Sequence, residues 1–314
     1  MRVLVTGADG FVGRRLVRAL LARRHDVLAA CRPGGPEPST WLGSDASLVR
    51  CIPLELAESK PVPLGSERLD AVVHLAAVSS GADARNDPVN AWEVNVVGTV
   101  RLLEALAARR GTGENPRVLL VSSGEVYGAG EPRPRQETDP VEPVAPYAAT
   151  KAAAELAGLE CWRRTGLGVM IARAFPHTGA GQSPRFVVPG FVGRLKEARR
   201  RGARTVPTGN LEPVRDLLDV ADVVAAYLGL IERGVAGQIY NVARGSGIAV
   251  GELFNRLARL LDVDALPEVD SALVRSGDIP HLVGDPAKLE RATGWRPTIT
   301  LEETLRGVVD AEAD

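Results

Sequence analysis

Cysteine and histidine are scarce in this sequence, and neither residue type forms a cluster. The three cysteines are odd in number and far apart, which argues against a disulfide framework and against a zinc knuckle. They are Cys31, Cys51 and Cys161. The four histidines are equally scattered: His25, His74, His177 and His281. We therefore expect no metal site, and the cysteine usage predicts a reducing, cytoplasmic setting.

The sequence also lacks an excess of charge of one sign and a long apolar run. Its 38 basic and 39 acidic residues are mixed throughout and give a formal net charge of −1, so we expect no nucleic-acid partner and no membrane partner. The apolar run before the first glycine covers only residues 3–5, which is too short for a signal peptide. With 45% hydrophobic residues among 314, the chain can bury a large core as a soluble globular protein.

The first seventeen residues predict a strand, a glycine turn and a helix. Residues 3–5 are apolar, Gly7, Gly10 and Gly13 follow at three-residue spacing, and apolar residues then recur at helical intervals. Gly7 would allow a sharp turn, Gly10 would let a diphosphate approach the backbone, and Gly13 would let the helix pack close to its strand. A tight structural turn is the alternative, but the position directly after an N-terminal strand favours a dinucleotide site.

Residues 6–13, TGADGFVG, resemble the TGxxGxxG signature of the extended short-chain dehydrogenases, a family of nucleotide-sugar epimerases, dehydratases and reductases. Later motifs extend this resemblance to the end of the chain. The resemblance implies a nicotinamide dinucleotide held at this turn by Gly7, Gly10, Phe11, Val12 and Gly13.

Strands and helices alternate over the first 175 residues, which predicts an α/β fold with a Rossmann-type doubly wound parallel sheet and a smaller C-terminal α/β substrate lobe. We expect strands at 26–30, 48–54, 69–75, 118–121 and 238–242. We expect helices at 90–108, from 147 onward, at 220–231 and at 251–261. Residues 1–175 would form the dinucleotide-binding domain, with about 210–245 crossing back to it, and 176–314 mainly the nucleotide-sugar-binding lobe.

The end of the second strand bears on the choice of cofactor. A carboxylate there would accept hydrogen bonds from the adenosine ribose and repel a phosphate, but this chain has Cys31 and Arg32. A guanidinium favours a 2′-phosphate through a charge-assisted contact, and Arg14 would add a second positive charge. We therefore predict NADP(H) in preference to NAD(H), with an ordinary surface arginine as the alternative interpretation of Arg32.

Small residues follow the strand expected at 69–75. The resemblance assigns cofactor contacts to Leu75, Ala76 and Ala77, and substrate contacts to Ser79 and Ser80. His74 lies inside the apolar strand, so we interpret it as a buried structural histidine rather than a catalytic one. Asn95 begins a segment that resembles the family's NVxGT; a helix kink or cap is one interpretation, and the family's role, holding backbone near the active site, is the other.

Tyr147 and Lys151 are four residues apart on an expected helix, so they project from the same face. A phenol titrating near ~10 is a poor acid-base group at neutral pH, and an ammonium one turn away would lower that pKa. Together with Ser123 they predict a Ser-Tyr-Lys site. Tyr147 would pass a proton to or from a sugar oxygen, Ser123 would polarise the carbonyl, and Lys151 would tune Tyr147 and hold the nicotinamide ribose.

Residues 173–182 resemble the family's RxFNHxGPGQ loop, with His177 as a substrate contact, but Pro176 replaces the usual asparagine and Ala180 the usual proline. Residues 209–220 resemble the GNLxxxRDxxDV block of the GDP-mannose 4,6-dehydratases and of the GDP-4-keto-6-deoxymannose reductases, and the C-terminal pattern is closer to the reductases. Arg215 and Arg275 would then clamp the diphosphate of a nucleotide sugar, GDP-linked by preference. A structural salt bridge is the alternative for either arginine.

Three functions compete on this sequence. The first is an NADPH-dependent reductase of the C4 ketone of a nucleotide-linked 4-keto-6-deoxyhexose. The second is a dehydratase or 4-epimerase, since dehydratases of the family use a glutamate at the position of Glu125 to take the C5 proton; against it, Gly124 replaces a polar residue. The third is a non-catalytic NADP-binding protein. Many relatives pair through the helices equivalent to those containing Asn90 and Tyr147, so we expect a homodimer.

Overall fold

The computed structural model describes residues 1–57, 62, 64–65, 67–274 and 277–311. Its centre is a seven-stranded sheet in the order β11-β6-β5-β4-β1-β2-β3, in which every neighbouring pair is parallel. The strands are β1 (Arg2–Thr6), β2 (Asp26–Cys31), β3 (Val49–Pro53), β4 (Ala71–His74), β5 (Arg117–Ser123), β6 (Gly168–Ala174) and β11 (Ile239–Val242). The predicted doubly wound parallel sheet is confirmed. Because the strand order reverses at β1 and β4, their carboxyl ends border a crevice.

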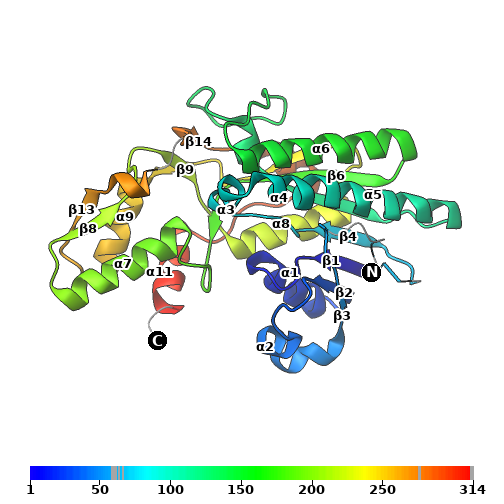
Figure 1. Ribbon diagram of the computed structural model, residues 1–314, viewed down its shortest axis with the longest axis horizontal. Coiled ribbons are helices and arrows are strands. Elements are labelled where there is room, and N and C mark those ends of the chain that lie inside the picture. The colour runs from blue at the N-terminus through cyan, green and yellow to red at the C-terminus, as the bar shows by residue number, and fades with distance from the viewer. Residues whose placement is uncertain (58–61, 63, 66, 275–276, 312–314) are drawn as a thin grey trace.

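Helices cover both faces of this sheet (Figure 1). One face carries α1 (Phe11–Ala22), α8 (Val220–Arg233) and α10 (Ala287–Thr293), and the other carries α5 (Gly98–Ala108) and α6 (Pro146–Thr165). Successive residues of β1 alternate between the two cores, with Val3 and Val5 in one and Leu4 in the other. Because both faces of the sheet are buried, the sequences of these strands are continuous apolar runs.

The helix expected over 90–108 is present and contains a π-helical turn in its middle. The chain forms α4 (Pro88–Trp92), then a π-helical turn η2 (Glu93–Val97), and only then α5. In the π turn, Asn95 is 2% exposed and its side chain binds the backbone of Val78 and the hydroxyl of Thr150. Wide turns of this kind often mark functional sites.

A second apolar core lies in the lobe on the left of Figure 1. Its helices are α7 (Val187–Arg201), α9 (Val250–Leu260) and α11 (Leu301–Ala311). Small sheets edge the lobe: β8 (Thr205–Thr208) with β13 (Leu266–Val269), and β9 (Val214–Asp216) between β12 (Gly247–Ala249) and β14 (His281–Leu282). Since α8 and β11 return to the main sheet, we keep the division at about residue 175, with 210–245 crossing back, as a proposal.

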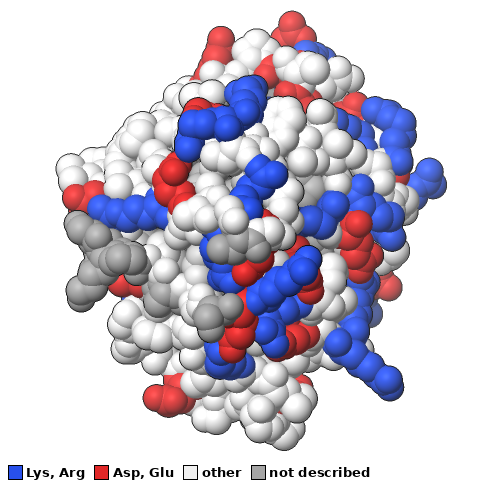
Figure 2. Space-filling model, turned by 90° about the vertical axis from the view of Figure 1, so that its right-hand side faces the viewer, with Lys and Arg blue, Asp and Glu red and all other residues white. Residues whose placement is uncertain are grey.

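Short elements complete the chain. They are α2 (Pro38–Leu42), η1 (Gly43–Leu48), α3 (Gly81–Asn86), η3 (Arg109–Thr112), η4 (Gly124–Tyr127), β7 (His177–Thr178), β10 (Leu218–Asp219) and η5 (Ser271–Leu273). Figure 2 shows basic and acidic side chains interspersed over one face. Among the described residues, no helix is both long and apolar enough to cross a membrane.

Candidate functional site

A cleft of about 1920 Å³ runs from the glycine turn after β1 to the lobe formed by α7 and α9. The carboxyl ends of β1, β2, β4, β5 and β6 border one part of it, as expected at a switch point of strand order. The catalytic, cofactor and substrate residues predicted from the sequence lie on its walls where the structure describes them. Arg14, the predicted second positive charge, does not line the cleft, and its Nε donates to the Asp9 carbonyl at 2.6 Å. Arg275 lies outside the described residues.

The glycine turn forms a cradle that side chains would fill. Gly7 has φ +65°, and a Cβ there would lie 2.9 Å from the amide nitrogen of Ala76. A Cβ on Gly13 would lie 2.1 Å from the carbonyl oxygen of Gly7. Thr6 Oγ1 accepts hydrogen bonds from the backbone of Leu75 and Ala76, which holds β4's end beside the turn. Bare backbone at a helix N-terminus fits a dinucleotide diphosphate.

The second strand ends at the same part of the cleft. Arg32 is exposed there and lines the cleft. A turn follows it, in which the Gly35 N–H donates to the Arg32 carbonyl oxygen. Sequence reasoning missed Asp9, whose carboxylate lies next to Gly35 in this wall. The available clue was its place between Gly7 and Gly10. Burial raises the pKa of the neighbouring Cys31 thiol to about 12, so this cysteine is an unreactive wall residue.

His74 is buried between two hydroxyl groups, as predicted. Its Nδ1 lies 2.7 Å from Thr6 Oγ1 and its Nε2 lies 3.0 Å from Thr99 Oγ1. Burial lowers the pKa of His74 to about 3, so the imidazole is neutral. The histidine therefore joins β1, β4 and α5 beneath the cleft and does not reach the reacting groups.

Tyr147, Ser123 and Lys151 come together on the cleft wall. Helix α6 begins with Pro146, a residue suited to the first helical position, and so places Tyr147 and Lys151 beside the end of β5. The Ser123 side chain lies close enough to the Tyr147 hydroxyl to lower its pKa. Lys151 Nζ donates to the carbonyl oxygen of Val121 at 2.8 Å and lies 6.0 Å from the Tyr147 ring centroid.

The electrostatics of this trio differ from the sequence expectation. Burial and the Glu125 carboxylate raise the pKa of Tyr147 above its usual range, while the Ser123 hydrogen bond lowers it. Lys151 does not offset this effect, because its ammonium is directed at the Val121 carbonyl. Burial lowers the pKa of Lys151 to about 8. At neutral pH the phenol is therefore protonated and can act as an acid.

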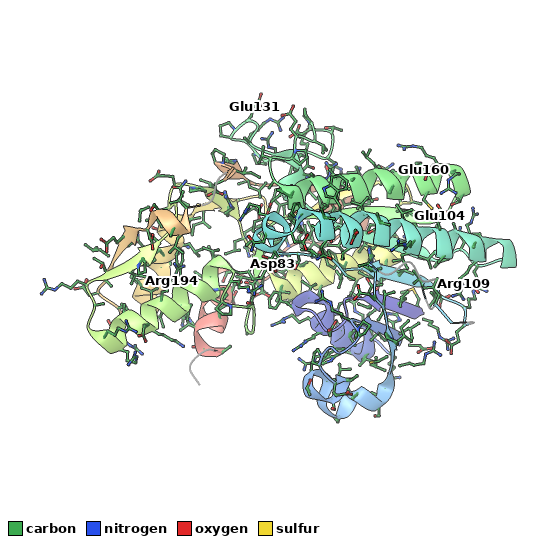
Figure 3. The ribbon with its side chains drawn as sticks, viewed as in Figure 1. Asp83, Glu104, Arg109, Glu131, Glu160 and Arg194 are labelled. Atoms are coloured by element: carbon green, nitrogen blue, oxygen red, sulfur yellow. The ribbon has the colours of Figure 1, made fainter. Side chains whose placement is uncertain are left out.

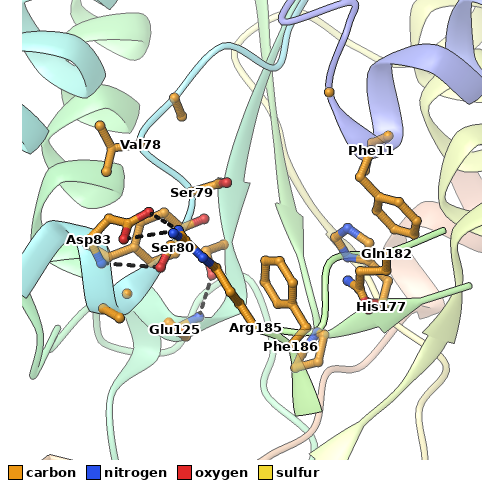
Figure 4. Close-up of a pocket in the computed structure, with 18 of the residues that line it drawn as sticks. Phe11, Val78, Ser79, Ser80, Asp83, Glu125, His177, Gln182, Arg185 and Phe186 are labelled. Atoms are coloured by element: carbon orange, nitrogen blue, oxygen red, sulfur yellow. Dashed lines mark hydrogen bonds and ion pairs between the residues drawn. The ribbon is translucent and has the colours of Figure 1, made fainter. Parts of the chain in front are cut away.

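Ser79, Ser80 and His177 lie on opposite walls of the cleft (Figure 4). Ser80 Oγ caps α3 by accepting the Asp83 N–H at 3.2 Å. His177 Nδ1 donates to the Phe175 carbonyl at 3.0 Å, and its ring stacks near Phe11 with centroids 6.5 Å apart. Burial lowers the pKa of His177, so this contact is made by a neutral imidazole.

Three arginines of the lobe also face the cleft. Arg215 donates to Asp278 at 2.5 Å and to the Ile279 carbonyl at 2.6 Å, so the salt bridge that the sequence left as an alternative is present. Sequence reasoning missed Arg194 on α7 (Figure 3) and Arg185. Figure 4 shows Arg185 reaching past Ser80 to Asp83, with N···O distances of 3.1 and 3.3 Å.

Gly124 and Glu125 follow Ser123 in η4. Glu125 lines the cleft, and its backbone N–H donates to Ser123 Oγ at 3.2 Å. A Cβ on Gly124 would meet three ring atoms of Phe175 at 3.0 Å. The same ring is held from another side by Gly284, where a Cβ would approach it to 2.5 Å. The space over Gly124 is therefore filled by an apolar ring.

This geometry agrees with comparisons to known proteins. The model of the NAD dependent epimerase/dehydratase family matches residues 3–243. The chain belongs to this family. Among its epimerase/dehydratase relatives, the GDP-6-deoxy-D-mannose reductase of Pseudomonas aeruginosa is 35% identical over 316 residues, covering 98% of this chain and 96% of the relative.

Solved structures of the epimerase/dehydratase family share the whole fold. RMD from Pseudomonas aeruginosa complexed with NADPH is 33% identical with a TM-score of 0.82, covering 99% of this chain and 98% of that one. The UDP-glucose 4-epimerase of Thermus thermophilus in complex with NAD is 32% identical with a TM-score of 0.85, at the same coverage. The expected family is confirmed, and this chain is an enzyme of the extended short-chain dehydrogenase type.

Proposed function

We propose that this enzyme is an NADPH-dependent reductase of the C4 ketone of a nucleotide-linked 4-keto-6-deoxyhexose, GDP-linked by preference. The observation that carries the choice of reductase is the packing of Phe175 against Gly124. An apolar ring occupies the space where a dehydratase of this family has a polar side chain before its glutamate. The relative named GDP-6-deoxy-D-mannose reductase supports both the reaction and the GDP linkage.

The residues present fit a nicotinamide dinucleotide. Gly7, Gly10 and Gly13 would admit its diphosphate to the N-terminus of α1, where Phe11 and Val12 begin the helix. The backbone from Leu75 to Ala77 would line the rest of its path. Bound there, the reduced nicotinamide supplies the hydride.

The Ser-Tyr-Lys group supplies the proton and the charge stabilisation. The Ser123 hydroxyl would hydrogen-bond the ketone oxygen, and the protonated Tyr147 phenol would give that oxygen its proton. Lys151 would hold the nicotinamide ribose from the same helix face as Tyr147. Ser79, Ser80 and His177 would contact the sugar, and Arg215 the diphosphate, with Arg275 proposed as its partner.

Cofactor preference is testable at Arg32. Arg32→Ala should weaken NADPH binding about tenfold or more, since a hydrogen bond to a charged group contributes ~1.5–3 kcal/mol. NADH lacks the 2′-phosphate and should bind the variant as it binds the parent protein. Titrating both cofactors by their fluorescence gives the two dissociation constants, and an unchanged ratio between them would remove the argument for a phosphate contact.

The dehydratase alternative is testable at Gly124. Gly124→Asp restores a polar residue but drives its side chain toward Phe175, so we expect a loss of about 1–3 kcal/mol in unfolding free energy and no dehydratase activity. Denaturant unfolding measures the first, and product analysis with GDP-mannose measures the second. A stable variant that dehydrates GDP-mannose would show that the site is a dehydratase lacking one group.

A homodimer and a cytoplasmic location stay proposals. The dimer is supported by apolar side chains exposed on adjoining helices: Trp92, Val97 and Val100 along α4 to α5, and Leu156 on α6, which is 70% exposed. Glu104 and Glu160, labelled in Figure 3, share Arg164 on the same pair of helices. Pairing two copies across these helices would cover the apolar side chains.

One assay separates the three functions. The protein is incubated with GDP-4-keto-6-deoxymannose and NADPH while the absorbance of the reduced cofactor is followed. Stoichiometric loss of NADPH supports the reductase. If NADPH is not consumed and a parent sugar nucleotide is dehydrated or epimerised without added cofactor, the enzyme is a dehydratase or 4-epimerase and not a reductase. Binding of NADPH without any turnover would favour the third.

A further inference from the structure

Glu155 is a buried carboxylate that the proposed reaction does not use. Its side chain is 6% exposed and lies on α6, one turn beyond Lys151. Ser122 Oγ donates to Glu155 Oε1 at 2.5 Å. Arg173 donates to both carboxylate oxygens, from Nε to Oε1 at 3.0 Å and from Nη2 to Oε2 at 2.8 Å. The ion pair is bidentate, and it is nearly sealed from water.

This carboxylate completes a row of contacts between α6 and β5. Three positions one turn apart on α6, Tyr147, Lys151 and Glu155, meet three consecutive residues of β5. The Tyr147 hydroxyl lies beside Ser123, Lys151 donates to the Val121 carbonyl, and Glu155 accepts from Ser122. Because the strand residues are consecutive, a shift or rotation of α6 would break all three contacts together. Glu155 itself lies behind the cleft wall that the other two helix residues form.

The neighbouring strand fixes the same carboxylate. Ser122 of β5 and Arg173 of β6 are partners in the parallel ladder, so Glu155 binds two adjacent strand ends at once. Arg173 also lies against the Tyr127 ring, with its guanidinium carbon 4.7 Å from the ring centroid, and Tyr127 donates to Asn241 on β11. The position of Glu155 is therefore determined by three strands of the main sheet.

The negative charge of Glu155 affects the protonation of Lys151. The Glu155 carboxylate raises the pKa of Lys151, opposing the effect of burial. The other titratable groups around Lys151 are the Tyr147 phenol on its own helix and the neutral His74 on β4. Glu155 is the acidic group among them. Without its charge, the effect of burial on Lys151 would be unopposed, and the buried Arg173 guanidinium would lose the carboxylate with which it is paired.

We propose that Glu155 is a positioning residue of this enzyme: its carboxylate, shared between Ser122 and Arg173, fixes α6 against β5 and so holds Lys151, one turn away, beside the reacting groups. The proposal rests on the proposed function for its kinetic consequence, but its effect on cofactor binding does not depend on the identity of the sugar.

The test is Glu155→Gln, which keeps the size of the side chain and one acceptor oxygen, removes the charge, and replaces the oxygen that accepts from Arg173 Nη2 by an amide donor. The pKa of Lys151 should then be about one unit lower than in the parent protein. NADPH should bind the variant about tenfold more weakly than the parent protein at about pH 9 and within about twofold at about pH 6. With GDP-4-keto-6-deoxymannose, the alkaline limb of the kcat profile should move to lower pH while KM for the sugar nucleotide stays within about threefold.

Glu160→Gln is the matched control, because the same change is made on the same helix at an exposed residue paired with Arg164. It should leave every profile unchanged. Where Glu155→Gln does not fold, as judged by circular dichroism, Ser122→Ala removes one hydrogen bond to the carboxylate and should give a smaller shift in the same direction. NADPH binding with an unchanged pH dependence in the folded variant overturns the proposal. A parent protein that binds NADPH but does not reduce the ketone contradicts the proposed function alone.

Discussion

Tyr147→Phe should lower kcat by about 10²–10⁴-fold, the usual contribution of general acid-base catalysis. The change removes the hydroxyl that lies beside Ser123 and would protonate the ketone oxygen, and it leaves the ring beside Lys151. NADPH binding should change by less than about threefold, because the lost interaction is needed only in the transition state. Steady-state kinetics and a fluorescence titration of NADPH measure the two quantities separately.

Tyr240→Phe is the control for this experiment. Tyr240 is also buried, and its hydroxyl accepts the Val235 N–H at 3.0 Å outside the cleft. The control variant should lose some stability and no catalytic rate per folded molecule. If Tyr147→Phe retained most of its turnover, the proton would come from another group, and Glu125 would be the first candidate.

Gly13→Ala should weaken cofactor binding strongly. The new Cβ would lie 2.1 Å from the Gly7 carbonyl oxygen and 2.8 Å from the Ala8 Cα, so β1 and α1 must separate. We expect NADPH binding to weaken about 10²-fold, the cost typical of a displacement of about 1 Å in a positioned site. Overpacking should also lower the unfolding free energy by about 1–3 kcal/mol.

The matched control is Gly307→Ala, which makes the same substitution in the exposed helix α11. No atom lies within 4 Å of a Cβ at Gly307, so the variant should gain about 0.5–1 kcal/mol because glycine is a poor helix former. Its NADPH affinity should be unchanged. Equal NADPH affinity in Gly13→Ala and the parent protein would contradict a dinucleotide site at this turn.

The elements that the sequence predicted well are those governed by local rules. The glycine turn after β1 could be predicted because its three glycines lie within seven consecutive residues and contact one another's backbone. The strands could be predicted because burial on both faces of the sheet requires apolar residues along their length. Tyr147 and Lys151 share a face because helix geometry alone places them there.

The features that the sequence could not disclose depend on contacts between distant segments. The π turn at Asn95 arises because its side chain binds Val78 and Thr150, which belong to a loop and to α6. The direction of the Lys151 ammonium is set by a carbonyl of β5. Burial and the Glu125 carboxylate raise the pKa of Tyr147, opposite to the expected direction. Spacing along the chain carries no information about either contact.

The same limit applies to charge pairs. Arg215 was expected at a diphosphate, and the sequence could not show that Asp278 would meet its guanidinium. Glu155 and Arg173 are 18 residues apart, and no local pattern joins a helix carboxylate to the end of the next strand. Buried ion pairs of this kind become visible only when the sheet and its covering helix are assembled.

The most direct test of the proposed reduction is the fate of the hydride. The enzyme is supplied with GDP-4-keto-6-deoxymannose and with NADPH carrying deuterium at both hydrogens of nicotinamide C4, and the sugar product is examined by mass spectrometry and NMR. The account predicts a single deuterium bonded to C4 of the product sugar for each NADPH oxidised. A product without deuterium at C4, or one formed with no net oxidation of NADPH, would contradict it.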